Sequence, residues 1–148
     1  MRSPTILVPT DLSVEGERAL GGALELARTY GGRVILLHVV EDMAVSPKDK
    51  GKAGGPHTPG AEGEAARTRK ELEAKRRALP PGVDVTVDVL LAPSVSHAIV
   101  DYAVEKGCDL IALSTQGRTG FRRLIVGSVA EAVLRASPVP LLIWPRQA

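Results

Sequence analysis

Four short runs of the chain are apolar at nearly every position, and this feature restricts the possible fold most strongly. The runs are TILVP at 5–9, RVILLHVV at 33–40, DLIALST at 109–115 and VPLLIW at 139–144. A strand that is apolar on both faces is typical of a parallel sheet that helices cover on both sides. We therefore expect these runs to be the buried strands of an α/β domain.

A fifth run, VDVTVDVLLA from Val83, has a different pattern. Valine alternates with Asp or Thr over its first half. Alternation of this kind predicts a strand with one exposed face, and we expect it at the margin of the sheet.

Segments with helical spacing of apolar residues separate these strands. They are expected between Ser13 and Gly31, from Ala61 to Leu79, between Ser94 and Gly107, and from Ser128 to Pro138. In the last helix the spacing places Val129, Ala132, Val133 and Ala136 on one face. The order strand, helix, strand with short connections implies right-handed crossovers between parallel strands. The expectation is one domain over residues 1–148, with an open five-stranded parallel sheet and helices on both faces.

Residues 41–60 have a composition unlike the rest of the chain. They contain four glycines and three prolines and show no apolar periodicity. This composition predicts a flexible surface loop between the second strand and the second helix.

The charge balance excludes several classes of partner. The chain has 19 basic and 17 acidic side chains, a formal charge of +2, so no global field favours nucleic acid or an anionic membrane. No apolar stretch approaches the roughly 20 residues that cross a bilayer. The apolar run before Pro9 is too short for a signal peptide. We expect a cytoplasmic protein without a nucleic-acid or membrane partner.

The segment STQGRTGFRRLIVGS, residues 114–128, is rich in groups that bind anions. It holds three glycines and three arginines and precedes a helix, whose first N–H groups favour an anion. Two alternatives stay open. Ser128 and Glu131 have the spacing of a capping box, which satisfies those donors without a ligand. Arg118, Arg122 and Arg123 can simply be solvated.

The standard phosphate motifs are absent from the chain. Neither G-x-G-x-x-G after the first strand nor G-x-x-x-x-G-K-[ST] occurs, which excludes the usual NAD-binding and P-loop chemistry. A different spacing is present: Gly117, nine residues, then Gly127 and Ser128.

With this spacing the chain resembles the universal stress protein family over essentially its whole length. The resemblance rests on ILVPTDLS (6–13), VILLHVVE (34–41), CDLIALSTQGRTGF (108–121) and LIVGSVAEAVLRASPVPLLIWP (124–145). ATP-binding members carry the loop G-x2-G-x9-G-[ST], and here Ser114 stands in place of its first glycine.

The resemblance implies a flavodoxin-like fold, close to the adenine nucleotide alpha hydrolases, with strand order 3-2-1-4-5. It also implies an adenine nucleotide, ATP or else AMP or ADP, with Mg²⁺. Pro9, Thr10 and Asp11 would border the adenosine, and Val39 would meet the adenine through its backbone. Asp11 would lie near the ribose or a phosphate-bound Mg²⁺, although a carboxylate there also favours the following helix N-terminus.

The phosphates would be held by the loop after the fourth strand and by the start of the last helix. Glycine lets the backbone approach a phosphate oxygen closely, and a serine hydroxyl can donate to it. The residues that the resemblance assigns to this role are Ser114, Gly117, Arg118, Gly120, Gly127, Ser128 and Val129.

The expected function is that of a dimeric, nucleotide-binding module of the stress response. The apolar last strand, 139–144, would pair two copies, because a bare sheet edge invites pairing. The alternative is a family member that binds no nucleotide and works through dimerisation or protein docking, which Ser114 favours. Trp144 could contribute to the dimer interface or pack on its own core.

Nothing in the chain resembles a catalytic constellation, and an ATP-using enzyme of a related fold is the least favoured reading. At most, slow ATP hydrolysis assisted by Mg²⁺ is expected. His38, His57 and His97 have no partner at metal-binding spacing, and Cys108 begins a strand, as a small core residue does.

Overall fold

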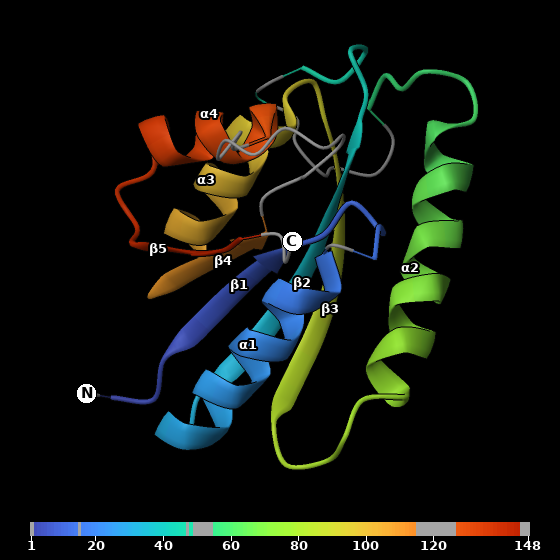
Figure 1. The fold of residues 1–148 in the computed structure, drawn as a ribbon. Coiled ribbons are helices and arrows are strands. Elements are labelled where there is room, and N and C mark those ends of the chain that lie inside the picture. Colours follow the sequence, from blue (N-terminus) through green and yellow to red (C-terminus); the bar gives the residue numbers. More distant parts are fainter. Residues whose placement is uncertain (1, 15, 47, 49–54, 115–126, 146–148) are drawn as a thin grey trace.

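A computed structural model describes residues 2–14, 16–46, 48, 55–114 and 127–145, and Figure 1 shows their arrangement. The strands are β1 (Thr5–Pro9), β2 (Arg33–Glu41), β3 (Asp84–Ala92), β4 (Leu110–Ser114) and β5 (Leu141–Trp144). The helices are α1 (Gly16–Tyr30), α2 (Ala61–Arg77), α3 (Val95–Glu105) and α4 (Ser128–Ala136).

The strands form one parallel sheet in the order β3-β2-β1-β4-β5. The predicted fold class and strand order are confirmed, and β3 lies at the margin as its alternating pattern predicted. The last strand is shorter than the expected range 139–144, since β5 begins only at Leu141.

Helices cover both faces of the sheet, α1 and α2 on one side and α3 and α4 on the other (Figure 1). Successive residues of a strand point to opposite faces, so the central strands supply two cores. Ile6 and Val8 of β1 pack with α1 and with Leu72 of α2. Leu7 packs with α3 and α4, including Ile99. This division explains why the central strands are apolar at every position.

The single tryptophan closes the contact between β5 and α1. A Cβ atom added at Gly22 of α1 would lie 2.0 Å from Cζ2 of Trp144, so the indole lies directly against the helix backbone. Trp144 packs against the core on the α1 face. Of the two roles expected for this residue, the structure therefore supports packing on its own core.

Only part of the apolar face of α4 is buried. Ala130 and Val133 are buried, whereas Ala136 is exposed and Val129 is 38% exposed. The helix packs on α3 through Ala130 and Val133. Val129, in its first turn, lies at the cavity at the carboxyl edge of the sheet. Apolar spacing alone could not show which of its apolar residues meet the core.

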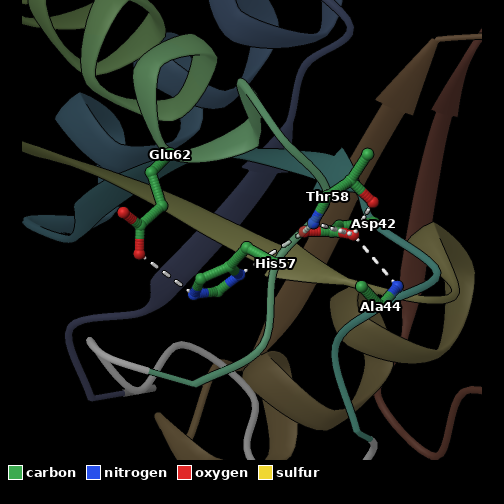
Figure 2. Close-up of polar contacts among 5 residues, drawn as sticks. All are labelled: Asp42, Ala44, His57, Thr58 and Glu62. Carbon is green, nitrogen blue, oxygen red and sulfur yellow. Dashed lines mark hydrogen bonds and ion pairs between the residues drawn. The ribbon is translucent and has the colours of Figure 1, made fainter.

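The segment 41–60 is attached at both ends to one buried carboxylate (Figure 2). Asp42 accepts hydrogen bonds from Ala44 N at 3.0 Å and from Thr58 N at 3.1 Å, and Thr58 Oγ1 also donates to it. These bonds, that from the Thr58 hydroxyl first, hold the pKa of Asp42 below its ordinary value against the opposing effect of burial. Residues 47 and 49–54 lie outside the described part, and the flexibility expected for this loop stays a prediction.

His57 lies between two carboxylates beside this attachment (Figure 2). Its Nε2 is 3.2 Å from Glu62 Oε1, and its Nδ1 is 3.4 Å from Asp42 Oδ2, close enough for an ion pair but not aligned as a hydrogen bond. The two carboxylates face opposite nitrogens of the ring and so do not converge on a point where one metal ion could sit. Within the described ranges, no group of three or more His, Cys, Asp or Glu side chains is placed to hold a metal.

Candidate functional site

A cavity of about 210 Å³ opens at the carboxyl edge of the sheet, where the ends of β1, β2 and β4 meet the starts of α1, α3 and α4. The chain runs from β1 outward to β2 on one side and later adds β4 on the other, so the strand order reverses between β1 and β4. Ligands of open α/β sheets bind at such a switch point.

Several residues predicted from the sequence line this cavity together. Pro9, Thr10 and Asp11 come from the end of β1, and Val39 comes from β2. Ser114, Gly127 and Val129 complete the lining from the opposite side. Ser128 begins α4 beside them without lining the cavity, and Gly117, Arg118 and Gly120 lie outside the described residues.

Hydrogen bonds hold the turn that carries Asp11. Thr10 N donates to Leu37 O at 2.8 Å, and Leu12 N donates to Thr10 Oγ1 at 3.0 Å. Leu12 has a φ of 68°, a left-handed conformation that is uncommon for a side chain of this kind. Asp11 Oδ1 accepts from Ser13 N at 2.9 Å and from the Ser13 hydroxyl. The turn therefore fixes one carboxylate oxygen of Asp11 at the rim of the cavity, five residues before α1 begins at Gly16.

His38 is a polar lining residue that the sequence reasoning considered only as a metal ligand. Its Nδ1 lies 2.7 Å from the carbonyl oxygen of Thr10. Because a carbonyl oxygen only accepts, Nδ1 is the donor, and a neutral ring then carries its lone pair on Nε2. The sequence signal that could have found His38 was its position as the single polar residue inside an apolar strand, next to Val39.

The apolar wall of the cavity was also missed. It is formed by Leu37, Leu113 and Ala130, together with Val95 and Ile99 from the first turns of α3. Helical periodicity marks such residues as core and cannot tell core from the lining of a cavity. Only the position of α3 beside the strand ends shows that its first turns face the site.

The first turn of α4 starts differently from the capping box considered in the sequence. The N-cap is Gly127, which has no side chain, and Ser128 is already the first helical residue. Glu131 Oε1 accepts from Arg135 Nη2 at 2.8 Å. The capping box expected from Ser128 and Glu131 is therefore wrong, and the first turn presents backbone N–H groups beside the cavity.

The reactive groups elsewhere are part of the scaffold. Cys108 is buried, and burial raises the pKa of its thiol, which makes it a poor nucleophile. Asp109 accepts from Thr5 N at 2.8 Å, and this bond lowers the pKa of its carboxyl. In the parts of the chain that the structure describes, no helix combines the length and apolarity needed to cross a bilayer.

Comparison with known proteins identifies the family. Residues 3–145 match the universal stress protein family. The chain belongs to the universal stress protein family. A universal stress protein of Methanocaldococcus jannaschii is 31% identical over 139 residues, which cover 93% of this chain and 79% of the relative.

Solved universal stress proteins share the fold along nearly the whole chain. UspA from Lactobacillus plantarum superposes with a TM-score of 0.72 at 24% identity, covering 97% of this chain and 98% of its own. A universal stress protein in complex with cAMP superposes with a TM-score of 0.66 at 20% identity, covering 98% of each chain. The universal stress protein from Archaeoglobus fulgidus in complex with dAMP superposes with a TM-score of 0.65 at 24% identity, covering 97% of this chain and 98% of the Archaeoglobus chain.

Proposed function

We propose that this universal stress protein binds an adenine nucleotide, ATP or else AMP or ADP, in the cavity at the carboxyl edge of the sheet. The observation that carries the proposal is the cavity itself, which joins an apolar wall, a carboxylate and a helix N-terminus at the switch point between β1 and β4. The protein would act as a cytoplasmic, dimeric binding module of the stress response rather than as an enzyme. The complexes of two family members with cAMP and dAMP support the ligand class.

The adenosine half of the nucleotide fits the wall between β2 and α3. Val39, Ile99 and Leu113 offer apolar surface for a planar base, and ligand sites are mostly apolar with a few polar groups that fix orientation. Backbone groups at Val39 would form hydrogen bonds with the edge of the adenine. Asp11, which the turn holds at the rim of the cavity, would accept hydrogen bonds from ribose hydroxyls.

The phosphate half fits the opposite side. Gly127 lets the backbone approach closely, and the first turn of α4, including Ser128 and Val129, offers N–H donors to an anion. The uncapped start of α4 supports this assignment. Ser114, Gly117, Arg118 and Gly120 are proposed to complete the phosphate site. Asp11 would help to hold a Mg²⁺ ion, which would offset the negative charge of the phosphates.

The direct test is a calorimetric titration of ATP, with and without Mg²⁺, into the wild type and Gly127→Val. Val at this position would obstruct the phosphates, so we expect low-micromolar binding, about 8 kcal/mol, to be lost in the variant. Gly21→Val is the matched control, because a Cβ at Gly21 meets nothing within 4 Å and this residue lies outside the cavity. Absence of ATP binding to the wild type, and of any co-purified nucleotide, would refute the proposal.

The homodimer is proposed to form through β5. This strand is at the edge of the sheet, and Leu142 is 37% exposed there. An uncovered apolar edge is a template for pairing with a second chain. Light scattering at tens of micromolar should report a dimer, and Leu142→Lys should give a monomer with an unchanged circular dichroism spectrum. A wild-type monomer at that concentration would contradict this assignment.

The second candidate function, a universal stress protein that binds no nucleotide, is favoured by Ser114, which replaces the first motif glycine at the end of β4. The calorimetric titration described above also distinguishes these two functions. A dimer that gives no heat with ATP, ADP or AMP would favour the second.

A further inference from the structure

Arg18, in the first turn of α1, is a half-buried residue with one donor atom that its surroundings do not satisfy. Its Nη1 atom is buried and has no hydrogen-bond partner among the residues that the structure describes. The neighbouring Glu17 is not available, because its carboxylate pairs with Lys75 of α2 at 2.8 Å. A buried guanidinium donor without a partner is costly, so its persistence points to an anion that completes the site.

The place of Arg18 in the fold suggests which anion. Gly16, two residues earlier, lines the cavity, and Gly22, one turn later on the same side of α1, lies against Trp144 at the end of β5. Residues four apart share a helix face, so Arg18 lies on the side of α1 that faces β4 and β5, one turn nearer the carboxyl edge than Trp144. This is the edge at which β4 ends and α4 begins.

We propose that Arg18 binds the phosphate chain of the nucleotide and thereby makes the site prefer ATP over adenosine. This inference rests on the proposed nucleotide function. The guanidinium is always charged and offers several donors in a planar fork, which suits phosphate oxygens. It would approach the phosphates from the α1 side, opposite the N–H groups of α4.

The test compares Arg18→Gln with the wild type in titrations of ATP, AMP and adenosine. The expected result is a loss of ATP affinity of roughly tenfold to a hundredfold, the range for a hydrogen bond to a charged group, with adenosine affinity unchanged. Arg28→Gln is the matched control, because Arg28 is exposed in the last turn of the same helix, and it should bind like the wild type.

A stability measurement separates a ligand contact from a structural role. Removing a buried donor that has no hydrogen bond in the described part of the chain should leave the melting temperature of the ligand-free protein unchanged or raise it. Arg18→Met, which retains the apolar stem, serves as the second variant if Arg18→Gln does not fold.

The outcomes distinguish the two proposals. Wild-type ATP affinity in the Arg18 variants would overturn this inference and leave the nucleotide function intact. Equal losses for ATP and adenosine, or a lowered melting temperature without ligand, would also overturn it. A wild type that binds none of the three ligands would overturn the nucleotide function and this inference with it.

Discussion

Two adjacent glycines of α1 allow a matched test of the contact between Trp144 and the helix. Gly21 and Gly22 are both inside the helix, so replacing either by Ala brings the same gain in helix propensity, about 0.5–1 kcal/mol. A Cβ at Gly21 meets nothing within 4 Å. A Cβ at Gly22 would lie 2.0 Å from Cζ2, 2.2 Å from Cε2 and 2.6 Å from Nε1 of Trp144.

The clash at Gly22 has a definite size. Carbon atoms in contact are about 3.5–4.0 Å apart, so the indole or the helix must move by roughly 1.5 Å. Forcing an extra methyl into a packed contact costs about 1–3 kcal/mol. Because the propensity gain is common to both variants, their difference in the free energy of unfolding reports the clash alone. We expect Gly21→Ala to stabilise the protein and Gly22→Ala to be about 1–3 kcal/mol less stable than Gly21→Ala.

Trp144 is the only tryptophan of the chain, so its fluorescence reports the displacement directly. Urea unfolding followed by fluorescence and by circular dichroism should give the two free energies, and emission from the native state should shift only in Gly22→Ala. In a Trp144→Leu background the gap between the two glycine variants should close, because the clashing rings are gone. Equal stability of the two variants with unchanged emission would refute the packing described for β5 and α1.

Three further variants test other contacts. Gly32→Ala should destabilise the protein by about 1–3 kcal/mol in urea unfolding, because its Cβ would lie 2.3 Å from the carbonyl oxygen of Pro4. Since the folded pKa of Asp42 is lowered, its contribution is present above the ordinary value of 3.8 and is lost as the pH falls through the folded pKa. Asp42→Asn should therefore have a lower urea midpoint than the wild type at pH 7, and the gap should narrow in acid; a gap independent of pH would contradict this. Tyr102→Phe removes a 2.9 Å hydrogen bond to Asp88 and should cost about 0.5–1.5 kcal/mol by chemical denaturation, with no cost if this bond is unimportant.

Much of the candidate site could be predicted because its residues lie at the carboxyl ends of the strands. Residues at the carboxyl ends of parallel strands meet at one edge whatever the details of packing, so Thr10, Asp11, Val39 and Ser114 could be placed there from the sequence. The apolar wall could not, because Ile99 has the same helical spacing as any core residue. Its role depends on where α3 lies relative to strands far away in the chain.

The capping box considered at Ser128 shows that a correct local motif does not fix where a helix begins. A serine three residues before a glutamate is the correct local signal, but the helix begins one residue too early for Ser128 to cap it, and Glu131 pairs with Arg135 instead. The start of a helix depends on the chain that leads into it, which a short motif does not contain.

Local pattern alone determined the strands, the helices and the parallel arrangement of this protein, since burial on both faces of a strand leaves a continuous apolar run. Tertiary structure decided the rest. It placed Trp144 against Gly22 and attached residues 42 and 58 through a buried carboxylate. It also left Nη1 of Arg18 without a hydrogen-bond partner in the described part of the chain. Each of these features depends on how closely two segments distant in the chain approach each other, and such approaches are set by packing in three dimensions rather than by local pattern.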